Sequence, residues 1–451
     1  MWKFALPRTL TTMQNRLRIY PRHVPFLFAV ATLASLRPMV ASAEVSVSDP
    51  PKQITCCPSY GCPLLPQDVF YNETVQRALH QIRSIPRKEI RRTPNDALSH
   101  LESSGNQDMA TLTLIGFKGG PEQINQDRAL VVSPFFLSKT DETCSGTDDL
   151  TTRRLLGVFD GHSNLGEHVS QYSVSELPKR LASKLEEIKL TSNLSEGMEI
   201  ELTKRALIDT FVELDKTAPA HVSGGCTASV ILQNGPKLFI ANAGDSRSFI
   251  AVYHKNSRKT QIVYISREDK PHLPDERKRV EAMGGQVYIP SRPGATSRVL
   301  YVDPVTRNQY GLAMSRSIGD WDAGRLGVIP NPLVDVIDIP ELIQTQMTQF
   351  SQCILLDHLG EMTPIPRDTA KEDDIHIFAI SATDGMMDYV DAQTIAEELA
   401  PSLFDEDAVH LLSACEKLIS MAASGWQSAK DGRYRDDIAI SVSKIRTPAP
   451  C

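Results

Sequence analysis

The sequence predicts an α+β fold built from antiparallel strands and amphipathic helices. Short apolar runs of strand length alternate with longer segments in which apolar residues recur at helical spacing. Strand-like runs also follow one another directly, as at 227–232 and 238–241, and the turn sequence Asn234-Gly235-Pro236 joins that pair. Consecutive strands joined by short turns favour antiparallel hairpins over a regular βαβ alternation, and the sequence shows no internal repeat.

The individual elements follow from the composition and spacing of these runs. Six runs are predicted as strands because they are short and rich in β-branched, aromatic and other apolar residues. They are Leu155–Phe159, Thr227–Leu232, Leu238–Ala241, Phe249–Tyr253, Ile375–Ile380 and Ile438–Val442. Three longer segments are predicted as helices because their apolar residues fall on one face. They are Leu202–Leu214, Ala392–Leu399 and Ala408–Ala423.

The composition of the 451-residue chain is that of a soluble globular protein. Of its residues, 41% are hydrophobic and 23% are charged, and the formal net charge is −7. These values exclude a collagen-like chain, a largely disordered chain and a polytopic membrane protein. The mild acidity also argues against a nucleic-acid partner, because nucleic-acid-binding proteins normally present a basic surface.

Residues 1–43 differ from the rest of the chain and are predicted to be an N-terminal targeting or signal segment. They contain six Lys and Arg residues and no Asp or Glu. The apolar run 24–36 before Ala41-Ser42-Ala43 is typical of a secretory signal, and it is shorter than the ~20 residues of a spanning helix. We therefore expect the secretory pathway, with membrane contact only if the segment is an uncleaved anchor. Arg-rich, acid-free leaders are also typical of transit peptides, so a mitochondrion or plastid is the alternative.

Residues 44–105 are predicted to be a linker or regulatory arm. The arm begins with a Pro-containing stretch in which Cys56, Cys57 and Cys62 cluster. These cysteines could be disulfide-bonded, lipidated or unpaired, and the absence of a C-x-x-C pair argues against structural zinc. The basic run 83–92 is interrupted by Pro86, which favours a solvated linker over a docking site for an acidic partner.

Five aspartates stand at the borders of predicted strands, several of them beside a glycine. They are Asp127, Asp160, Asp245, Asp384 and Asp436. A single Asp-Gly is more often a turn than a ligand, but carboxylates gathered at strand ends repel one another unless cations neutralise them. Ligands that are all oxygen suit Mg²⁺ or Mn²⁺ better than zinc. One bridging aspartate could hold two such ions about 4 Å apart, an arrangement that activates water and stabilises a transferring phosphoryl group.

The order and spacing of these motifs resemble those of the metal-dependent type 2C serine/threonine protein phosphatases. The matching blocks are 125–127 (NQD), 157–162 (GVFDGH), 223–230 (SGGCTASV), 241–247 (ANAGDSR), 269–287 (DKPHLPDERKRVEAMGGQV), 312–320 (LAMSRSIGD), 382–388 (ATDGMMD) and 436–442 (DDIAISV). The resemblance covers residues 106–446, which are expected to form the catalytic domain, with an insertion at 340–374. It implies two packed antiparallel sheets flanked by helices, a four-layer α-β-β-α sandwich.

The resemblance also implies a metal centre of two Mn²⁺ or Mg²⁺ ions, with a weaker third. Asp160 would bridge the two ions and Gly161 would contribute its carbonyl. Asp384 and Asp436 would complete the coordination of one ion. Asp127 and Gln126 would lie near the other ion and contact it partly through water. The positions associated with the third ion are Asp245 and Asp388.

The activity implied by the resemblance is hydrolysis of phosphoserine and phosphothreonine in proteins. A metal-bridged hydroxide would attack phosphorus directly, without a phosphoenzyme. His162 matches the residue that protonates the leaving seryl or threonyl oxygen, a contribution typically worth ~10²–10⁴ in rate. The expected partners are phosphoprotein substrates, and the protein is expected to be a monomer.

Several positions depart from the family pattern. Glu122 stands where many members have a basic residue that binds substrate phosphate, and Lys118 could take that role. Asp437 stands where the family commonly has Asn, so Asp436 is assigned as the ligand. Ser163 begins a block that usually begins with glycine. Because of Glu122, the second hypothesis is a weak or inactive pseudophosphatase that acts as a binding module.

The basic residues of the 269–287 and 312–320 blocks are expected to be structural or exposed rather than catalytic. Arg316 is assigned a structural role, because its block contains the small and apolar residues of a scaffold. Arg277, Lys278 and Arg279 are expected on an exposed helix, which is favoured over a face that docks substrate.

Overall fold

The structure is a computed structural model that describes most of the predicted catalytic domain. The described residues are 89–90, 101–105, 107–118, 122–135, 153–191, 193–220, 224–292, 295–302, 307–351, 354–356, 362–364 and 374–446. The chain divides into two compact units, Met1–Ser59 and Tyr60–Cys451, and every described residue belongs to the second. The predicted targeting segment and the cysteine cluster of the arm lie outside the described residues, so both remain predictions.

Two antiparallel sheets form the framework. The five-stranded sheet has the order β17-β10-β9-β6-β5 and the six-stranded sheet the order β12-β11-β20-β21-β3-β2. The first comprises β5 (Arg128–Val132), β6 (Arg154–Phe159), β9 (Ala228–Asn234), β10 (Lys237–Ala243) and β17 (Leu333–Asp338). The second comprises β2 (Leu101–Gly105), β3 (Met109–Leu114), β11 (Arg247–His254), β12 (Lys259–Ile265), β20 (Ile375–Ala382) and β21 (Ile438–Lys444). The predicted hairpin is β9–β10, with Phe239 opposite Leu232.

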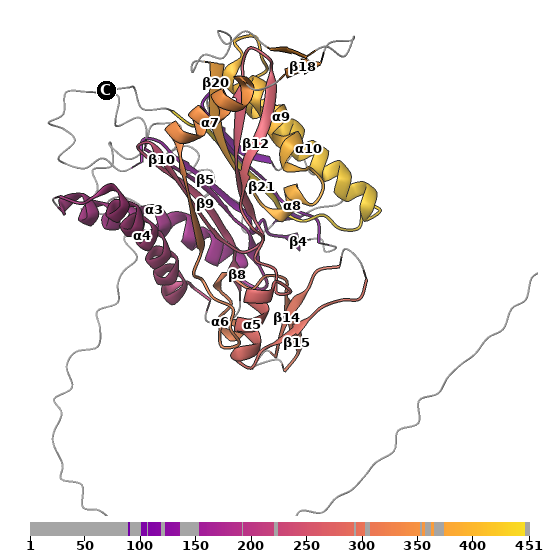
Figure 1. Cartoon of the computed structure of the whole chain (residues 1–451). Coiled ribbons are helices and arrows are strands. Elements are labelled where there is room, and N and C mark those ends of the chain that lie inside the picture. The colour runs from indigo at the N-terminus through magenta and orange to yellow at the C-terminus, as the bar shows by residue number, and fades with distance from the viewer. Residues whose placement is uncertain are drawn as a thin grey trace, which may run out of the picture. The chain divides into compact units, whose positions relative to one another are not determined.

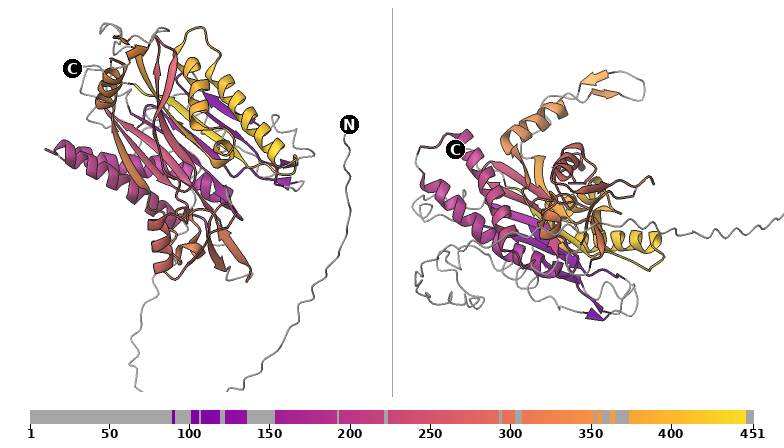
Figure 2. Two further views of the ribbon diagram at one scale, coloured as in Figure 1. Left: turned by 45° about the vertical axis from the view of Figure 1, so that its right-hand side comes forward. Right: turned by 90° about the horizontal axis from the view of Figure 1, so that it is seen from below.

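The two sheets pack face to face and helices cover their outer faces, as Figures 1 and 2 show. Helices α3 (Gly166–Leu190) and α4 (Glu196–Thr217) lie against the five-stranded sheet, and α9 (Ala392–Phe404) and α10 (Leu411–Ala429) lie against the six-stranded sheet. Because α3 covers one face of the five-stranded sheet at this edge and the six-stranded sheet covers the other, all five residues of β5 and all six of β6 are buried. The predicted α-β-β-α sandwich is confirmed.

Apolar stripes explain why the outer helices dock where they do. In α10 the buried side chains recur every three or four residues: Leu411, Ala414, Cys415, Leu418, Ile419, Ala422 and Trp426. They pack with strands of the six-stranded sheet in one cluster, while α3 and α4 pack with the five-stranded sheet in another. Each outer layer therefore has its own apolar core.

A small subdomain projects from one end of the sandwich, at the bottom of Figure 1. It contains α5 (Pro274–Ala282), β13 (Gln286–Tyr288), β14 (Arg298–Val302), β15 (Gln309–Leu312) and α6 (Trp321–Gly324). Its core is a separate cluster around Val280, Val299 and Leu312. The short strands β7 (Gly161–His162), β8 (Gly225–Cys226) and β16 (Ile318–Gly319) form one sheet, which ties this subdomain to the end of β6.

The predicted insertion at 340–374 is described only in part. Helix α7 (Ile339–Ser351) contributes Ile339 and Ile343 to the core beside the five-stranded sheet, and β18 (Ile354–Leu356) pairs with β19 (Met362–Pro364). The other short elements are β1 (Glu89–Ile90), β4 (Glu122–Gln123) and α8 (Asp384–Met387). Among the described residues, no helix is both long enough and apolar enough to span a membrane.

Candidate active site

Asp160 and Gly161 are fixed at the end of β6 by contacts with two neighbouring segments. The Asp160 N–H donates to Thr227 Oγ1 at 3.1 Å, and the Thr227 N–H donates to the Asp160 carbonyl at 2.9 Å. The Gly161 N–H donates to the Gln126 carbonyl at 3.2 Å. A Cβ at Gly161 would lie 2.6 Å from that carbonyl oxygen and 2.7 Å from the Gly166 oxygen, so only glycine fits.

The structure brings the predicted aspartates into one electrostatic cluster. We call the set the acidic cluster; it comprises Asp127, Asp160, Asp245, Asp384, Asp388 and Asp436. Burial, and then the charges of Asp127 and Asp384, raise the pKa of Asp160 well above its ordinary value. Burial together with Asp245 and Asp436 raises the pKa of Asp384 to about 8. Mutual repulsion between buried carboxylates of this kind favours the binding of a cation among them.

The donor chemistry of the acidic cluster fits hard divalent ions. Oδ1 of Asp127 is buried without a hydrogen-bond partner, and a buried carboxylate oxygen of this kind requires a cation or a donor. Within the parts of the chain that the structure describes, however, no three His, Cys, Asp or Glu side chains converge closely enough to hold a metal ion as they stand. The residues fit Mg²⁺ or Mn²⁺ by chemistry, and their roles as ligands remain a prediction.

Two lysines neutralise part of the acidic cluster. Lys118 Nζ lies 2.8 Å from Asp436 Oδ1 and 3.2 Å from Asp437 Oδ2. Lys270 Nζ lies 2.7 Å from Asp245 Oδ2. The Tyr434 hydroxyl donates to the second oxygen of Asp436 at 2.9 Å. Lys118 had been singled out as a candidate to bind phosphate, whereas sequence reasoning did not identify the role of Lys270.

Asp437 has a different environment from its neighbour Asp436. Its carboxylate accepts the N–H of Gly116 at 2.5 Å and the N–H of Gln126 at 3.2 Å, and the residue is 2% exposed. It therefore ties the start of β21 to two backbone positions around residues 116 and 126, more than 300 residues earlier in the chain. These contacts agree with the assignment of Asp436, rather than Asp437, as a metal ligand.

His162 is paired with an aspartate that the sequence analysis did not single out. Nε2 of His162 lies 2.6 Å from Asp320 Oδ2, and the Ser317 hydroxyl donates to the same oxygen at 2.7 Å. Burial opposes protonation of His162, but Asp320 outweighs it, so the pKa of His162 is raised. A Cβ on Gly225 would lie 2.2 Å from Asp320 Oδ2, so the glycine leaves room for the pair. The only signal for Asp320 was its place at the end of the 312–320 block.

The loop after His162 keeps a tight turn without the usual glycine. Ser163 has φ 62° and Leu165 has φ 68°, so both adopt the left-handed conformation that favours glycine. The Gln126 side chain donates to the Ser163 carbonyl at 2.9 Å and to Glu167 Oε2 at 3.0 Å. Gln126 thus supports this loop, whereas the resemblance implied a place near a metal ion.

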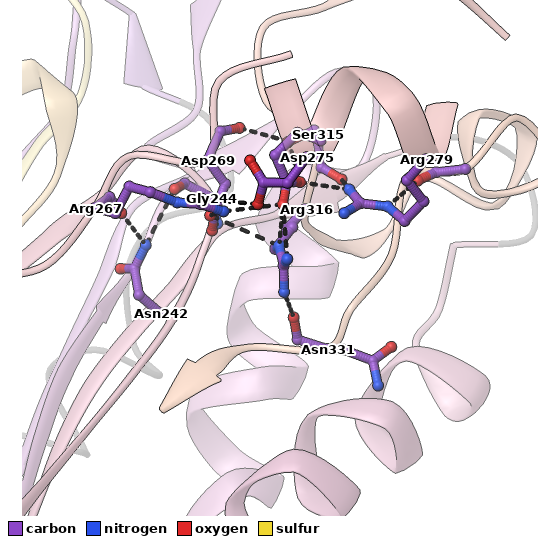
Figure 3. A network of polar contacts seen from close by, with 11 residues as sticks. Asn242, Gly244, Arg267, Asp269, Asp275, Arg279, Ser315, Arg316 and Asn331 are labelled. Atoms are coloured by element: carbon purple, nitrogen blue, oxygen red, sulfur yellow. Dashed lines mark hydrogen bonds and ion pairs between the residues drawn. The ribbon is translucent and has the colours of Figure 1, made fainter. Parts of the chain in front are cut away.

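The two predictions about arginines have different outcomes. Arg316 is 8% exposed, its Nη2 donates to Glu276 Oε1 at 2.6 Å and its Nη1 donates to the Asn331 carbonyl at 2.7 Å (Figure 3), which confirms its structural role. Arg277 and Lys278 lie on the exposed side of α5, as expected. The prediction that Arg279 is exposed is wrong, because its side chain donates to the carbonyls of Ser315 at 2.8 Å and Gly327 at 2.9 Å.

Comparison with known proteins identifies the family of the chain. The sequence profile described as "Protein phosphatase 2C" matches residues 132–425, more than half of the chain. The chain therefore belongs to the protein phosphatase 2C family. It is 25% identical over 358 residues to "Probable protein phosphatase 2C 73" of Arabidopsis thaliana, covering 75% of this chain and 81% of the relative. It is 28% identical over 390 residues to "Probable protein phosphatase 2C 1" of the same plant, covering 80% and 69%.

A solved structure supports the same fold. The serine-threonine phosphatase 2C from Toxoplasma gondii superposes with a TM-score of 0.52 and 16% sequence identity, covering 80% of this chain and all of that chain. At this level of identity the similarity shows the fold alone. The site residues are therefore argued from their geometry in this chain.

Proposed function

We propose that the chain hydrolyses phosphoserine and phosphothreonine in proteins with two Mn²⁺ or Mg²⁺ ions bound at the acidic cluster. Membership of the protein phosphatase 2C family supports protein phosphatase activity. The observation that supports the metal-dependent mechanism is the His162–Asp320 pair, whose side chains lie 2.6 Å apart. His162 stands two positions after Asp160 in the chain. A proton donor thus lies next to the carboxylates that would hold the ions.

The metal ligands in this proposal are the carboxylates of Asp127, Asp160, Asp384 and Asp436, with the carbonyl of Gly161. Divalent ions bound there supply Lewis acidity: they lower the pKa of water and draw charge from a phosphoryl group. The protein holds these ligands in position through backbone contacts, as the pairing of Asp160 with Thr227 illustrates.

The chain's own contribution to bond cleavage is proton donation by His162. Oδ2 of Asp320 accepts a hydrogen bond from Nε2–H of His162. This contact fixes the orientation of the ring and stabilises the imidazolium form. The imidazolium then supplies a proton to the departing seryl or threonyl oxygen, which is a poor leaving group without one. Ser317 and the backbone of Gly224 hold Asp320 in turn, at 2.7 Å and 3.0 Å.

The test is Mn²⁺-dependent hydrolysis of a phosphoserine peptide by the full chain. The Asp160→Asn variant serves as the inactive reference. Asp209→Asn, which alters an exposed ion pair with Arg205 on α4, is the matched surface control. We expect activity in the wild type and the surface control that exceeds that of Asp160→Asn by orders of magnitude. Wild-type activity no higher than that of Asp160→Asn would contradict the proposal.

A binding module without turnover is the second candidate, and one observation favours it. Lys118 and Tyr434 engage both oxygens of Asp436, so the carboxylate must exchange these partners before it can bind an ion. A pseudophosphatase would bind the phosphopeptide, measured by fluorescence anisotropy, without releasing phosphate. The combined measurement of binding and release distinguishes the two candidates.

The protein is proposed to act as a monomer on phosphoproteins, and residues 1–43 are proposed to target it to its compartment. Support for delivery comes from the basic, acid-free composition of that segment. The secretory pathway or a membrane anchor is proposed, with a mitochondrion or plastid as the alternative. Mapping the mature N-terminus of the native protein tests delivery, and light scattering tests the monomer.

A further inference from the structure

Lys270 forms a buried ion pair inside the acidic cluster. Its Nζ lies 2.7 Å from Asp245 Oδ2, and the side chains of Lys270 and Asp245 are only 18% and 1% exposed. The second oxygen of Asp245, Oδ1, is buried without a hydrogen bond. A buried carboxylate is costly unless a positive charge compensates it. In this structure the compensating charge belongs to the protein itself.

Hydrogen bonds between the neighbouring residues Gly244 and Asp269 hold Asp245 and Lys270 side by side. The Gly244 N–H donates to Asp269 Oδ2 at 3.1 Å, and the Asp269 N–H donates back to the Gly244 carbonyl at 2.9 Å. These residues directly precede Asp245 and Lys270. Gly244 has φ 122°, and a Cβ there would lie 2.6 Å from the Thr227 side chain, so the close approach requires glycine. The reciprocal pair places Lys270 beside Asp245.

A buried carboxylate on α5 fixes this arrangement from the other side. Glu276 is 0% exposed and accepts from Arg316 Nη2 at 2.6 Å, Arg267 Nη2 at 2.9 Å and the Ser315 hydroxyl at 2.5 Å. The Ser315 N–H donates to the Asp269 carbonyl at 2.8 Å. Figure 3 shows Asp269, Ser315 and Arg316 converging at this point, with Arg267 and Gly244 beside them. We call these residues, with Glu276, the Glu276 network.

We propose that Lys270, positioned by the Glu276 network, acts as a fixed cation for Asp245 and prevents a third divalent ion from binding there. The inference rests on the proposed metal centre and differs from the weaker third ion that the family resemblance implies. An ammonium 2.7 Å from Asp245 occupies the space of a ligand-bound ion and repels a divalent cation that approaches the remaining oxygen. Lys270 is thus a positioning residue that sets the number of ions at the acidic cluster.

The main experiment is calorimetric titration of the metal-free full chain with MnCl₂. We expect two bound ions in the wild type and in Lys270→Arg, which keeps the charge. Lys270→Met should bind one additional ion, or bind its weakest ion at least about tenfold more tightly, because the repulsion is removed. Lys278→Met, which removes an exposed lysine on α5, is the matched control and should behave as wild type. An unchanged stoichiometry and affinity in Lys270→Met would overturn the proposal.

A second pair of variants tests the inference if Lys270→Met does not fold. In the wild-type background, Asp245→Asn should leave the number of bound Mn²⁺ ions unchanged, because Lys270 and not an ion is the proposed cation at that carboxylate. Loss of an ion in this single variant would contradict the proposal. The double variant Lys270→Met/Asp245→Asn removes both charges together, and it should bind the same number of Mn²⁺ ions as the wild type.

The same titration separates this inference from the proposed function. If the wild type binds no Mn²⁺, the proposed metal centre fails and the inference fails with it. If the wild type binds two ions and Asp245→Asn binds one, only the inference fails. Glu276→Gln is expected to weaken the discrimination against a third ion, whereas Glu281→Gln, which alters an exposed pair with Arg277, should not.

Discussion

At the scale of single residues, chain neighbours were predictable and distant partners were not. The acidic residues stood out because each borders an apolar run, and the structure does gather them. Asp320 lies 158 positions from His162, and Lys270 lies 25 positions from Asp245, so neither pairing leaves a local pattern. Such contacts depend on how β16 and the 269–287 segment fold back onto the ends of the strands. Only the three-dimensional structure shows them.

The pairing of His162 with Asp320 predicts a dependence on the leaving group. His162→Gln and Asp320→Asn should each lower kcat for a phosphoserine peptide by ~10²-fold or more, because the alkoxide then leaves without a well-placed proton donor. An aryl phosphate, whose leaving group needs no proton, should lose much less. Steady-state kinetics on both substrates measures the ratio. Equal losses on the two substrates would show that the pair acts through structure alone.

The glycine after Asp384 predicts a second residue-scale effect. A Cβ at Gly385 would lie 1.9 Å from the Asp437 carbonyl oxygen, which is backbone and cannot swing away. Gly385→Ala should therefore lower the free energy of unfolding by about 1–3 kcal/mol, and it should weaken Mn²⁺ binding by displacing Asp384. Gly197→Ala in α4, where nothing lies within 4 Å, is the matched control and should be neutral or stabilise by up to about 1 kcal/mol. Urea unfolding of both variants tests the difference.

At the scale of elements, periodicity located six of the strands and missed the longer helices α3 and α7. The predicted run 375–380 became β20 (Ile375–Ala382), and 408–423 became α10 (Leu411–Ala429). Helix α3 was not predicted, because its buried face includes Gly166, Ser170 and Ser173. Small residues in its first turns allow the helix to lie close to the strand ends, and Pro178 interrupts the apolar stripe that Leu177, Leu181 and Leu185 form further along.

The Glu276 network predicts how the stability of α5 depends on pH. Burial alone would raise the pKa of Glu276. The hydrogen bonds from Arg279 and Arg316 outweigh this effect and lower the pKa to about 2. A carboxyl whose pKa is lowered on folding stabilises the protein above its unfolded value of about 4.3, and this stabilisation is lost as pH falls through about 2. Glu276→Gln should lower the free energy of unfolding at pH 7 by about 3 kcal/mol. The deficit relative to wild type should shrink as the pH falls from 4 to about 2.

Urea unfolding across that pH range measures the deficit, with Glu281→Gln as the exposed control. The control should follow the wild type at every pH, because an exposed ion pair contributes less than about 1 kcal/mol. A deficit in Glu276→Gln that is the same at every pH would indicate that packing, and not the charge, stabilises α5.

At the scale of the whole molecule, the candidate metal ligands come from both sheets. Asp160 follows β6 of the five-stranded sheet, whereas Asp384 follows β20 and Asp436 precedes β21 of the six-stranded sheet. Strands of the two sheets contact one another, and burial with mutual repulsion raises the pKa of Asp160 and Asp384. Without divalent ions this repulsion acts across the interface between the sheets. The sequence singled out these residues as candidate ligands, but it could not show that they join the two layers.

Metal binding should therefore stabilise the whole sandwich. At a Mn²⁺ concentration 100 times the dissociation constant, linkage gives about 2.7 kcal/mol, which corresponds to a rise in Tm of roughly 4 °C for a domain of this size. Calorimetric melting of the metal-free full chain, with and without MnCl₂, measures the rise. Asp160→Asn and Asp384→Asn remove one ligand from each sheet, so both should lose most of the metal-dependent rise. Their metal-free melting temperatures should increase, because a buried amide has neither to take up a proton nor to bury a charge. Asp209→Asn should keep the full rise. An equal rise in all four proteins would mean that Mn²⁺ stabilises the fold at some place other than the interface between the sheets.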